Sequence, residues 1–196
     1  MTDKFTNKLN YEIKGKLKNI AKKLAQNYEI KIGLLAEHSG SESIGENMDL
    51  AGLGAVLEYG ADIKITQKMA AYLHFKAKEL GLPEKKEKGD GYIHIPARSW
   101  LYEPIVKGDL IKYLKENFLP DSEFFEEFAE DKDYEKLAKK IAEICLLQIF
   151  KAFENGGIHG EWAKNSEFTI AGKNSNKPLI DTGYLEQHIT YEINKK

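Results

Sequence analysis

"KPLIDTGYLEQHITYEI", Lys177 to Ile193, combines an extended segment, a turn and a strand in one short stretch. Pro178 favours extended backbone, Asp181 or Thr182 can cap a turn, and Gly183 allows a backbone conformation closed to other residues. Apolar and polar residues then alternate through Ile193, which predicts a half-buried strand. The stretch therefore predicts a bend that seats a final strand.

Asp181-Thr182-Gly183 after two aliphatic residues also has the wording of an aspartic-protease half-site. In such enzymes two carboxylates share one proton and act as acid and base. A protease protomer needs most of its fold after this loop, whereas Gly183 lies 13 residues from the end of the sequence. A single half-site would also require a dimer with both aspartates meeting at its axis. We therefore interpret Asp181 as a turn residue and expect no catalytic residue.

Hydrophobic periodicity elsewhere predicts both helices and strands. The strongest helical pattern covers Tyr134 to Phe153, or about residues 133–154, and is closed by Asn155-Gly156-Gly157. Further helices are expected over Phe5–Leu24, Leu50–Ala61 with Gly60 as a C-cap, Gln67–Gly81 with Thr66 as a cap, and Ile105–Phe118. Strands are expected at Ile30–Leu34, Asp62–Thr66 and Gly91–Leu101, and loops at His38–Asp49, Pro83–Gly91 and Gly157–Asn176. These patterns predict a single α+β domain over residues 1–196, with a small antiparallel or mixed sheet packed against several helices.

Composition narrows the class of protein. The chain is 42% hydrophobic and 31% charged, with a net charge of −2, so no global field draws it to DNA or to anionic lipid. No apolar run reaches the length of a membrane span, and Cys145, the only cysteine, lies in an apolar helical pattern that favours a core position. We expect a soluble, cytosolic chain without a membrane or specific nucleic-acid partner.

Metal and cofactor motifs are missing from the sequence. The five histidines are scattered, with no H-x-x-x-H pair, and phosphate-binding, dinucleotide-binding and nucleophile-elbow motifs are absent. We therefore expect no cofactor and no metal. Two alternatives from other classes stay open: a metal-dependent hydrolase using His94, His159 and Asp181, and a prophage nucleic-acid-binding module with a local lysine and aromatic face.

Three groups of motifs occur in a fixed order. "LAGLGAVLEYGADIKI" (Leu50 to Ile65) precedes "IHIPARSWLYEPI" (Ile93 to Ile105); the long helix is followed by "EWAKNSEFTIAGK" (Glu161 to Lys173); and the opening stretch comes last. Over roughly residues 50–193 this order resembles the virion-morphogenesis or tail-completion proteins of tailed bacteriophages, a Mu-like family with neck and head-to-tail joining roles. The matching positions are Glu58-Tyr59-Gly60, Ile95-Pro96-Ala97-Arg98, then Trp162, Ser166, Thr169 and Lys173, and finally Pro178 to Leu185.

The resemblance implies a non-enzymatic phage or prophage structural protein that acts in virion assembly. It implies a homo-oligomeric ring that contacts other tail or head–tail connector proteins. The protein would be located in the virion tail or neck, and in the host cytoplasm during assembly. A tail-terminator or minor tail protein is an alternative of the same class. The chain departs from the family pattern at Ser99, Trp100, Ala163 and His188.

Eight residues are candidates for interface or structural roles: Glu58, Gly60, Pro96, Arg98, Trp100, Trp162, Asp181 and Gly183. Arg98 is the only arginine in a lysine-rich chain, which suggests a planar partner that lysine serves poorly. We hypothesise that it pairs with a carboxylate, either Asp181 in the same chain or one on a neighbouring subunit; the alternative is an exposed arginine without a special role. Trp100 and Trp162 can fill the core or a subunit interface.

Overall fold

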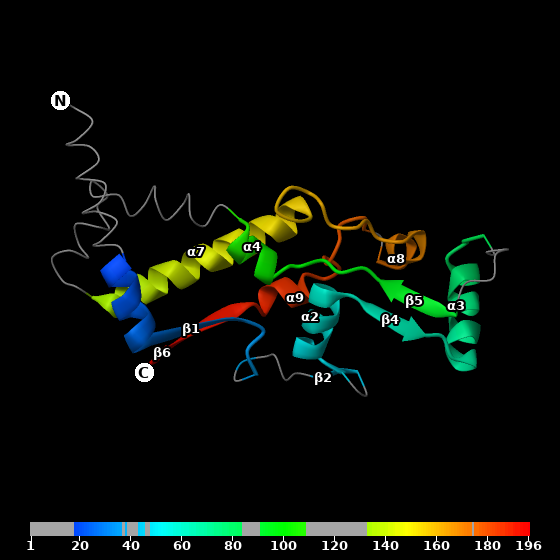
Figure 1. Cartoon of the computed structure of the whole chain (residues 1–196). Coiled ribbons are helices and arrows are strands. Elements are labelled where there is room, and N and C mark those ends of the chain that lie inside the picture. The colour runs from blue at the N-terminus through cyan, green and yellow to red at the C-terminus, as the bar shows by residue number, and fades with distance from the viewer. Residues whose placement is uncertain are drawn as a thin grey trace, which may run out of the picture.

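The computed structural model describes residues 18–36, 38, 43–45, 48–83, 91–108, 133–173 and 175–196. Within these ranges the chain has the expected α+β class, with the strands divided among three two-stranded antiparallel sheets (Figure 1). No described helix combines the length and the apolar character needed to cross a membrane. The expected helices over Phe5–Leu24 and Ile105–Phe118 and the expected loop over Pro83–Gly91 lie largely outside the described residues.

The longest helix of the described residues is α7 (Tyr134–Asn155). Asp133 caps its start by accepting the N–H groups of Glu135 and Lys136, and Gly156 ends it in the left-handed conformation at φ 75°. Both ends of this helix agree with the sequence-based prediction. Its apolar side supplies much of the core, including buried Ile149, Ala152 and Phe153.

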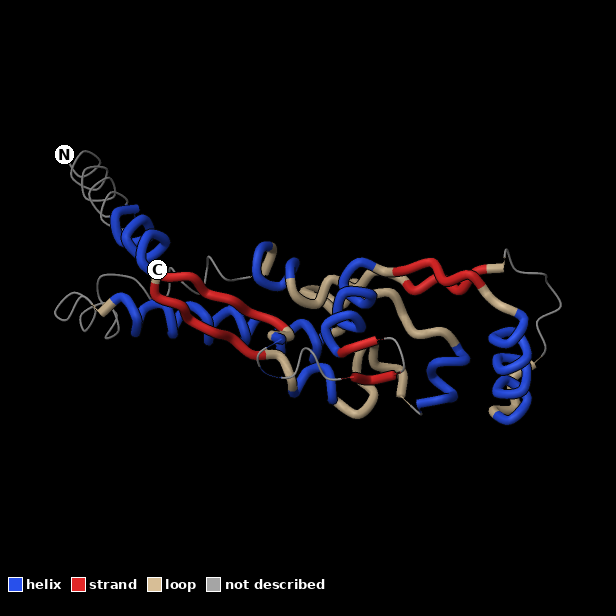
Figure 2. Tube along the Cα trace, turned by 90° about the horizontal axis from the view of Figure 1, so that it is seen from below, coloured by secondary structure: helices blue, strands red, loops and turns tan. Residues whose placement is uncertain are grey.

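The strand predicted at the end of the sequence is β6 (Thr190–Lys195), and its partner is β1 (Tyr28–Gly33). The two strands run antiparallel, with Ile30 opposite Ile193 and Ile32 opposite Tyr191, and they lie beside α7 (Figure 2). This sheet therefore pairs a strand near the start of the described chain with a strand near its end. Residues 18–27, which include part of the first expected helix, are helical and precede β1.

Two short helices form the middle of the molecule. In α2 (Leu50–Tyr59), Asp49 accepts the N–H of Gly52 and Gly60 ends the helix at φ 76°, as predicted. The other helix, α4 (Tyr102–Val106), follows a segment that begins at Pro96. The strand expected over Gly91–Leu101 is shorter, because β5 covers only Tyr92–Ile95 and Pro96 has no N–H to continue a ladder.

A second two-stranded sheet lies between α3 and the middle of the molecule. Strand β4 (Ala61–Lys64) pairs with β5, and α3 (Gln67–Glu79) lies at the far end of this ribbon (Figure 1). Thr66 caps α3 by accepting the N–H of Met69, as predicted from the sequence. The helix has no buried residue.

Two of the expected loops contain regular structure. Within His38–Asp49, strand β2 (Ser43–Gly45) pairs with β3 (Met48–Asp49), and within Gly157–Asn176 residues Glu167–Lys173 form α8. The loop prediction is therefore wrong for these parts. Ser166 caps α8 by accepting the N–H of Thr169, a signal that is present in the sequence. Near the end of the chain, α9 (Tyr184–Gln187) follows the Asp181-Thr182-Gly183 turn.

Candidate functional site

The side chain of Glu58 joins the end of α2 to the start of α4. Although only 7% exposed, its carboxylate accepts four hydrogen bonds. Two come from the N–H groups of Trp100 at 2.7 Å and Leu101 at 2.8 Å, one from the N–H of Tyr102 at 3.2 Å, and one from the Ser99 hydroxyl at 2.5 Å. The first N–H groups of a helix have no partner inside it and favour a negative charge. Glu58 therefore caps α4 from a different helix.

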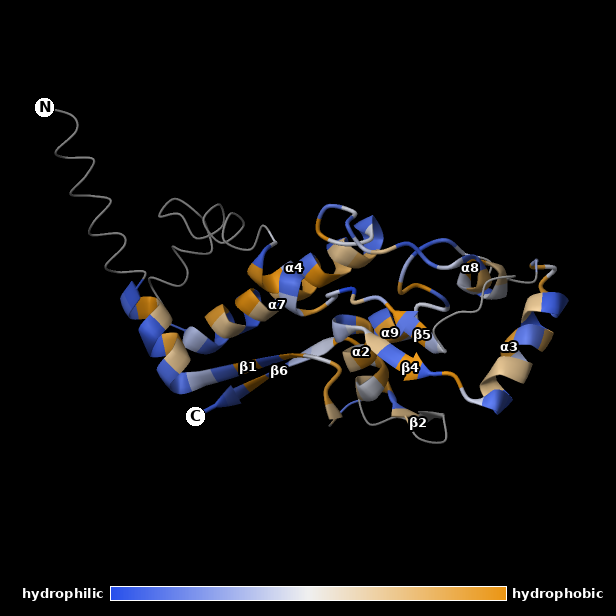
Figure 3. Ribbon diagram, turned by 45° about the vertical axis from the view of Figure 1, so that its right-hand side comes forward, coloured by the Kyte–Doolittle hydropathy of each residue, from blue (hydrophilic) through white to orange (hydrophobic). Residues whose placement is uncertain are grey.

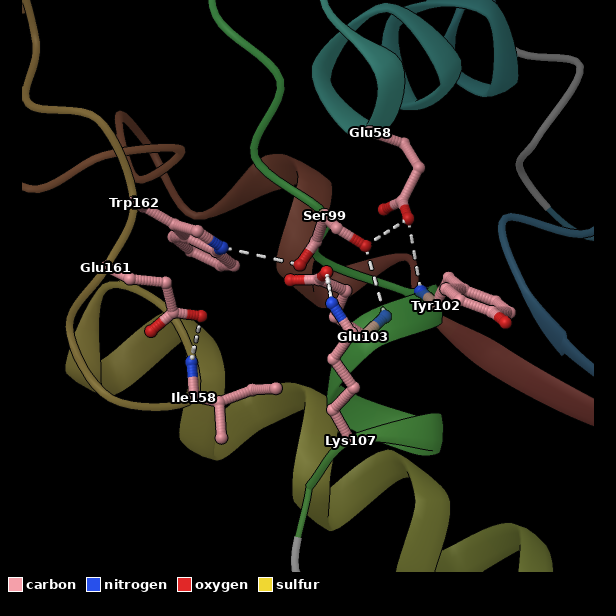
Figure 4. Close-up of polar contacts among 8 residues, drawn as sticks. All are labelled: Glu58, Ser99, Tyr102, Glu103, Lys107, Ile158, Glu161 and Trp162. Carbon is pink, nitrogen blue, oxygen red and sulfur yellow. Dashed lines mark hydrogen bonds and ion pairs between the residues drawn. The ribbon is translucent and has the colours of Figure 1, made fainter.

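Ser99 extends this cap by one more bond. While its hydroxyl donates to Glu58, the same oxygen accepts the N–H of Glu103 at 3.0 Å (Figure 4). Ser99 stands where the resembling family has proline, and a proline has no hydroxyl. Serine at this position therefore supplies a hydroxyl that binds both Glu58 and the first turn of α4.

Arg98 is buried, and its side chain binds the backbone of the segment that follows α7. Its Nε donates to the carbonyl of Ala163 at 2.8 Å, and its Nη2 donates to the carbonyl of Lys164 at 3.2 Å. A longer contact of 3.5 Å joins Nη2 to Asn165 Oδ1. Burial lowers the pKa of the guanidinium below its ordinary value.

The suggested pairing of Arg98 with Asp181 is wrong for the described part of the chain. No ion pair joins these two side chains there, and Asp181 is exposed. The physical reason is that backbone carbonyls take up the guanidinium donors: two acceptors in neighbouring peptides match its forked geometry. Arg98 thus makes several hydrogen bonds, but its acceptors are the carbonyls of two successive residues in place of the planar carboxylate that the sequence suggested.

Further polar contacts continue from Arg98 to the Asp181 turn. Asn165 Nδ2 donates to the carbonyls of Asn176 at 3.2 Å and Lys177 at 3.0 Å. Lys173 Nζ donates to the carbonyls of Lys177 at 2.5 Å and Ile180 at 2.7 Å. Burial is the main cause of a lowered pKa at Lys173; Arg98 adds to the lowering, and Asp181 opposes it. These contacts fix the segment that leads into Gly183, which adopts φ 79°. The extended backbone expected there is wrong, because Pro178 and Leu179 form a turn in which Leu179 adopts φ 59°.

An aromatic stack lies beneath the polar contacts. The rings of Trp100 and Phe153 meet edge to face at 6.1 Å and 64°, and those of Phe153 and Trp162 at 5.6 Å and 89°. Trp100 Nε1 donates to the carbonyl of Gly54 at 2.9 Å, and Trp162 Nε1 donates to that of Ser99 at 3.3 Å. Both tryptophans are buried in the protomer core, so of the two alternatives given above the core position is confirmed.

Two glycines allow the close approach of these elements. A Cβ on Gly54 would lie 2.5 Å from Leu34 Cδ1 and 3.1 Å from Trp100 Cζ2. A Cβ on Gly60 would lie 2.7 Å from the carbonyl oxygen of Ile95 and 2.8 Å from the nitrogen of Ala97. Gly60 thus sits where backbone meets backbone, at a φ that favours glycine.

Glu161 organises the turn after α7. It accepts the N–H group of Ile158 at 3.0 Å (Figure 4) and that of His159 at 2.6 Å. Partial burial acts to raise its pKa, but the backbone hydrogen bonds outweigh this effect and the pKa lies below its ordinary value. The carboxylate of Glu161 is thus occupied by backbone N–H groups of the turn.

A small pocket lies between α4, α7 and this turn. It has a volume of about 120 Å³, and its lining includes Pro104, Gln148, Lys151 and His159. Gln148 is 7% exposed, and among the described residues its Nε2 has no hydrogen-bond partner. The side-chain N–H₂ group of Gln148, a residue that lines this pocket, is therefore a buried donor without an acceptor among the described residues.

Candidate catalytic groups do not gather in this region. The described residues contain no group of three or more His, Cys, Asp or Glu side chains that could hold a metal ion. The trio of the hydrolase alternative is therefore not brought together: His94 contacts Asp62 at 2.6 Å on the exposed β4–β5 ribbon. Cys145 is buried in α7, and burial raises the pKa of its thiol, so a reactive thiolate is disfavoured.

We refer to the set Glu58, Arg98, Ser99, Trp100, Trp162 and Asn165 as the junction. Of the eight candidate residues, Glu58, Arg98, Trp100 and Trp162 belong to it, and Gly60 shapes its backbone. Sequence reasoning missed Ser99 and Asn165 as functional contacts. A search of family models, curated proteins and solved structures yields no match to this chain.

Proposed function

We propose that this chain is a non-enzymatic structural protein of a tailed phage or prophage. It acts in virion assembly, completing the tail or joining it to the head at the neck as a homo-oligomeric ring. Its partners are further copies of itself and other tail or connector proteins.

The convergence of separate motifs at the junction carries this proposal. Glu58, in the stretch Leu50–Ile65, binds Ser99 and Trp100 in the stretch Ile93–Ile105. Arg98 binds the "WAKN" segment that follows the long helix, and Asn165 in that segment binds Lys177 at the start of the last stretch. Glu58 and Arg98, two residues that carry the resemblance, therefore hold distant parts of this chain together.

The chemistry at the junction supports a scaffold more than an active site. Every donor or acceptor described above for Glu58 and Arg98 faces a partner within the protein, and both side chains are buried. Catalytic acids and bases instead need access to a substrate within hydrogen-bond reach. A network committed to backbone groups stabilises shape, which is what a subunit of an assembly needs.

Deletion of the gene from the phage or prophage that carries it tests the proposal. After induction or infection, electron microscopy should show full heads and tails that are not joined, and supplying the wild-type gene from a plasmid should restore joined particles. Loss of a tail terminator would instead give tails of uncontrolled length, which separates the two roles within the class. Normal infectious particles from the deletion strain would refute an assembly role.

A further inference from the structure

The outward face of α3 is the most unusual surface of the described chain. The half-buried apolar residues Met69, Leu73 and Ala77 recur every four positions and define one side of the helix. Tyr72 and Phe75 project from another side and are 58% and 63% exposed. In an ordinary surface helix large apolar side chains lie on the covered side. Figure 3 shows α3 standing apart from α7 and from the β1–β6 sheet.

Two lysines lie beside these two aromatic rings. Helix α3 contains Lys68, Lys76 and Lys78 and a single acidic residue, Glu79, which pairs with Lys76 at 2.8 Å. Lys68 lies one turn before Tyr72 on the same side of the helix, and Lys78 flanks Phe75. We call Lys68, Tyr72, Phe75 and Lys78 the α3 face.

The negative charge of the chain is concentrated elsewhere in the sequence. Residues 109–133 contain nine acidic residues and three lysines, a net charge of −6, whereas the whole chain has −2. The remaining residues therefore carry +4. The same acidic segment includes Phe118, Phe124, Phe125 and Phe128, so its composition complements the α3 face in both charge and apolar content.

One end of the acidic segment attaches at the end of the molecule remote from α3. The segment follows α4, in the middle of the molecule, and leads into the start of α7, which lies at that remote end (Figure 1). Two different surfaces favour a head-to-tail contact between copies over a two-fold symmetric one. Repeated head-to-tail contacts close into a ring or extend into a filament.

We propose that the α3 face binds the acidic segment, residues 109–133, of a second copy of this chain. Tyr72 and Phe75 supply the apolar area that becomes buried, and the lysines attract the partner and fix its orientation. The inference deepens the proposed function and rests on it, because it identifies the contact through which copies associate.

Analytical ultracentrifugation of the full chain over a concentration series at low and high salt provides the first test. The wild type should self-associate, and added salt should weaken the association because it screens the charges. Tyr72→Ala combined with Phe75→Ala should weaken it at least tenfold, about 1.4 kcal/mol, while thermal unfolding stays unchanged. Tyr59→Ala is the matched control: this residue is 79% exposed but lies outside the α3 face, so association should be retained.

A charge exchange gives a second readout that a folding defect cannot imitate. Lys68→Glu with Lys78→Glu should abolish self-association. So should, separately, the four substitutions that change the net charge of the acidic segment from −6 to +2: Glu123→Lys, Glu126→Lys, Glu127→Lys and Glu130→Lys. Mixing the two variants should restore it, because each reversed α3 face then meets a reversed acidic segment. Failure of the mixture to associate overturns the proposal.

Other outcomes overturn the proposal in distinguishable ways. If the α3 variants associate like the wild type, copies meet through another surface and the assembly role stands without this contact. A wild type that is monomeric at every concentration excludes self-docking, whereas unjoined heads and tails in the deletion strain would still support the assembly role. If the α3 variants lose binding to single-stranded DNA and keep self-association, nucleic acid is the occupant.

Discussion

The carboxylate of Glu58, on the last turn of α2, lies 2.7 Å from the backbone nitrogen of Trp100 and 3.2 Å from that of Tyr102, the first residue of α4. The cap brings a buried negative charge to N–H groups that have no acceptor within their own helix. Charge-assisted hydrogen bonds of this kind are among the stronger polar contacts in proteins. The junction depends on this contact, and its removal is the most direct test of the junction.

Glu58→Gln should lower the free energy of unfolding by roughly 2–3 kcal/mol. The substitution keeps the size of the side chain but removes the charge and turns one acceptor into a donor that faces N–H groups. Urea unfolding followed by tryptophan fluorescence measures the change. Glu143→Gln, on an exposed position of α7, is the control and should stay within about 0.5 kcal/mol of the wild type.

Arg98→Lys should release the segment around Asn165. A lysine ammonium cannot reach the carbonyls of Ala163 and Lys164 with the fixed fork of a guanidinium. We expect a loss of about 1–3 kcal/mol and faster amide hydrogen exchange between residues 162 and 173. Lys139→Ala at an exposed position of α7 should change neither quantity. Unchanged exchange in Arg98→Lys would mean that the lysine ammonium satisfies the same carbonyls.

Gly60→Ala should destabilise the fold severely, whereas Gly172→Ala should not. At Gly60 the new methyl group would meet backbone atoms of Ile95 and Ala97 at 2.7 and 2.8 Å, at a backbone φ of +76°. At Gly172, inside α8, nothing lies within 4 Å. We expect a loss of at least about 2 kcal/mol for the first variant and a gain of up to about 1 kcal/mol for the second. Thermal unfolding of the two proteins side by side checks the contrast.

Stability should fall at acidic pH partly through Glu161. Its pKa is lower in the folded protein than in the unfolded chain, so its contribution is present above the unfolded value of about 4.3. The contribution is lost as the pH falls through the folded pKa. Glu161→Gln should therefore reduce the acid dependence of the melting temperature below about pH 4.3. The exposed Glu154→Gln is the control, and an identical acid dependence in both variants would contradict the assignment.

Gln148→Met should raise the free energy of unfolding by about 1 kcal/mol. The substitution preserves length and removes a buried N–H₂ group that has no partner among the described residues. Urea unfolding measures the change, with Leu147→Met on the more exposed side of α7 as the control. Destabilisation by Gln148→Met would show that the amide oxygen contributes more than the orphan nitrogen costs.

Local signals explain which parts of the fold could be predicted from the sequence. The caps at Thr66, Gly60 and Gly156 all lie where the sequence places them, because capping depends on a residue and its near neighbours. The alternation that ends at Ile193 likewise predicts β6. The α8 helix was missed because Thr169, Ile170 and Gly172 have low helix propensity.

Contacts between distant segments could not be predicted in the same way. Nothing in the sequence around Glu58 indicates that its carboxylate accepts the N–H groups of residues 100–102. The acceptors of Arg98 are carbonyls, which every residue possesses, so composition cannot identify them. The tryptophans could be identified as anchors, but the choice between core and interface required Phe153 between them.

The pairing of β1 with β6 also bears on how the protein is made. Strand β1 is synthesised early, but its partner leaves the ribosome only after α7 and the junction have been translated. Until then β1 exposes an unpaired edge with Ile30 and Ile32, and such edges invite pairing with other chains. Closing so large a loop is slow. During translation, this strand is therefore the part of the described chain that most needs protection by a chaperone.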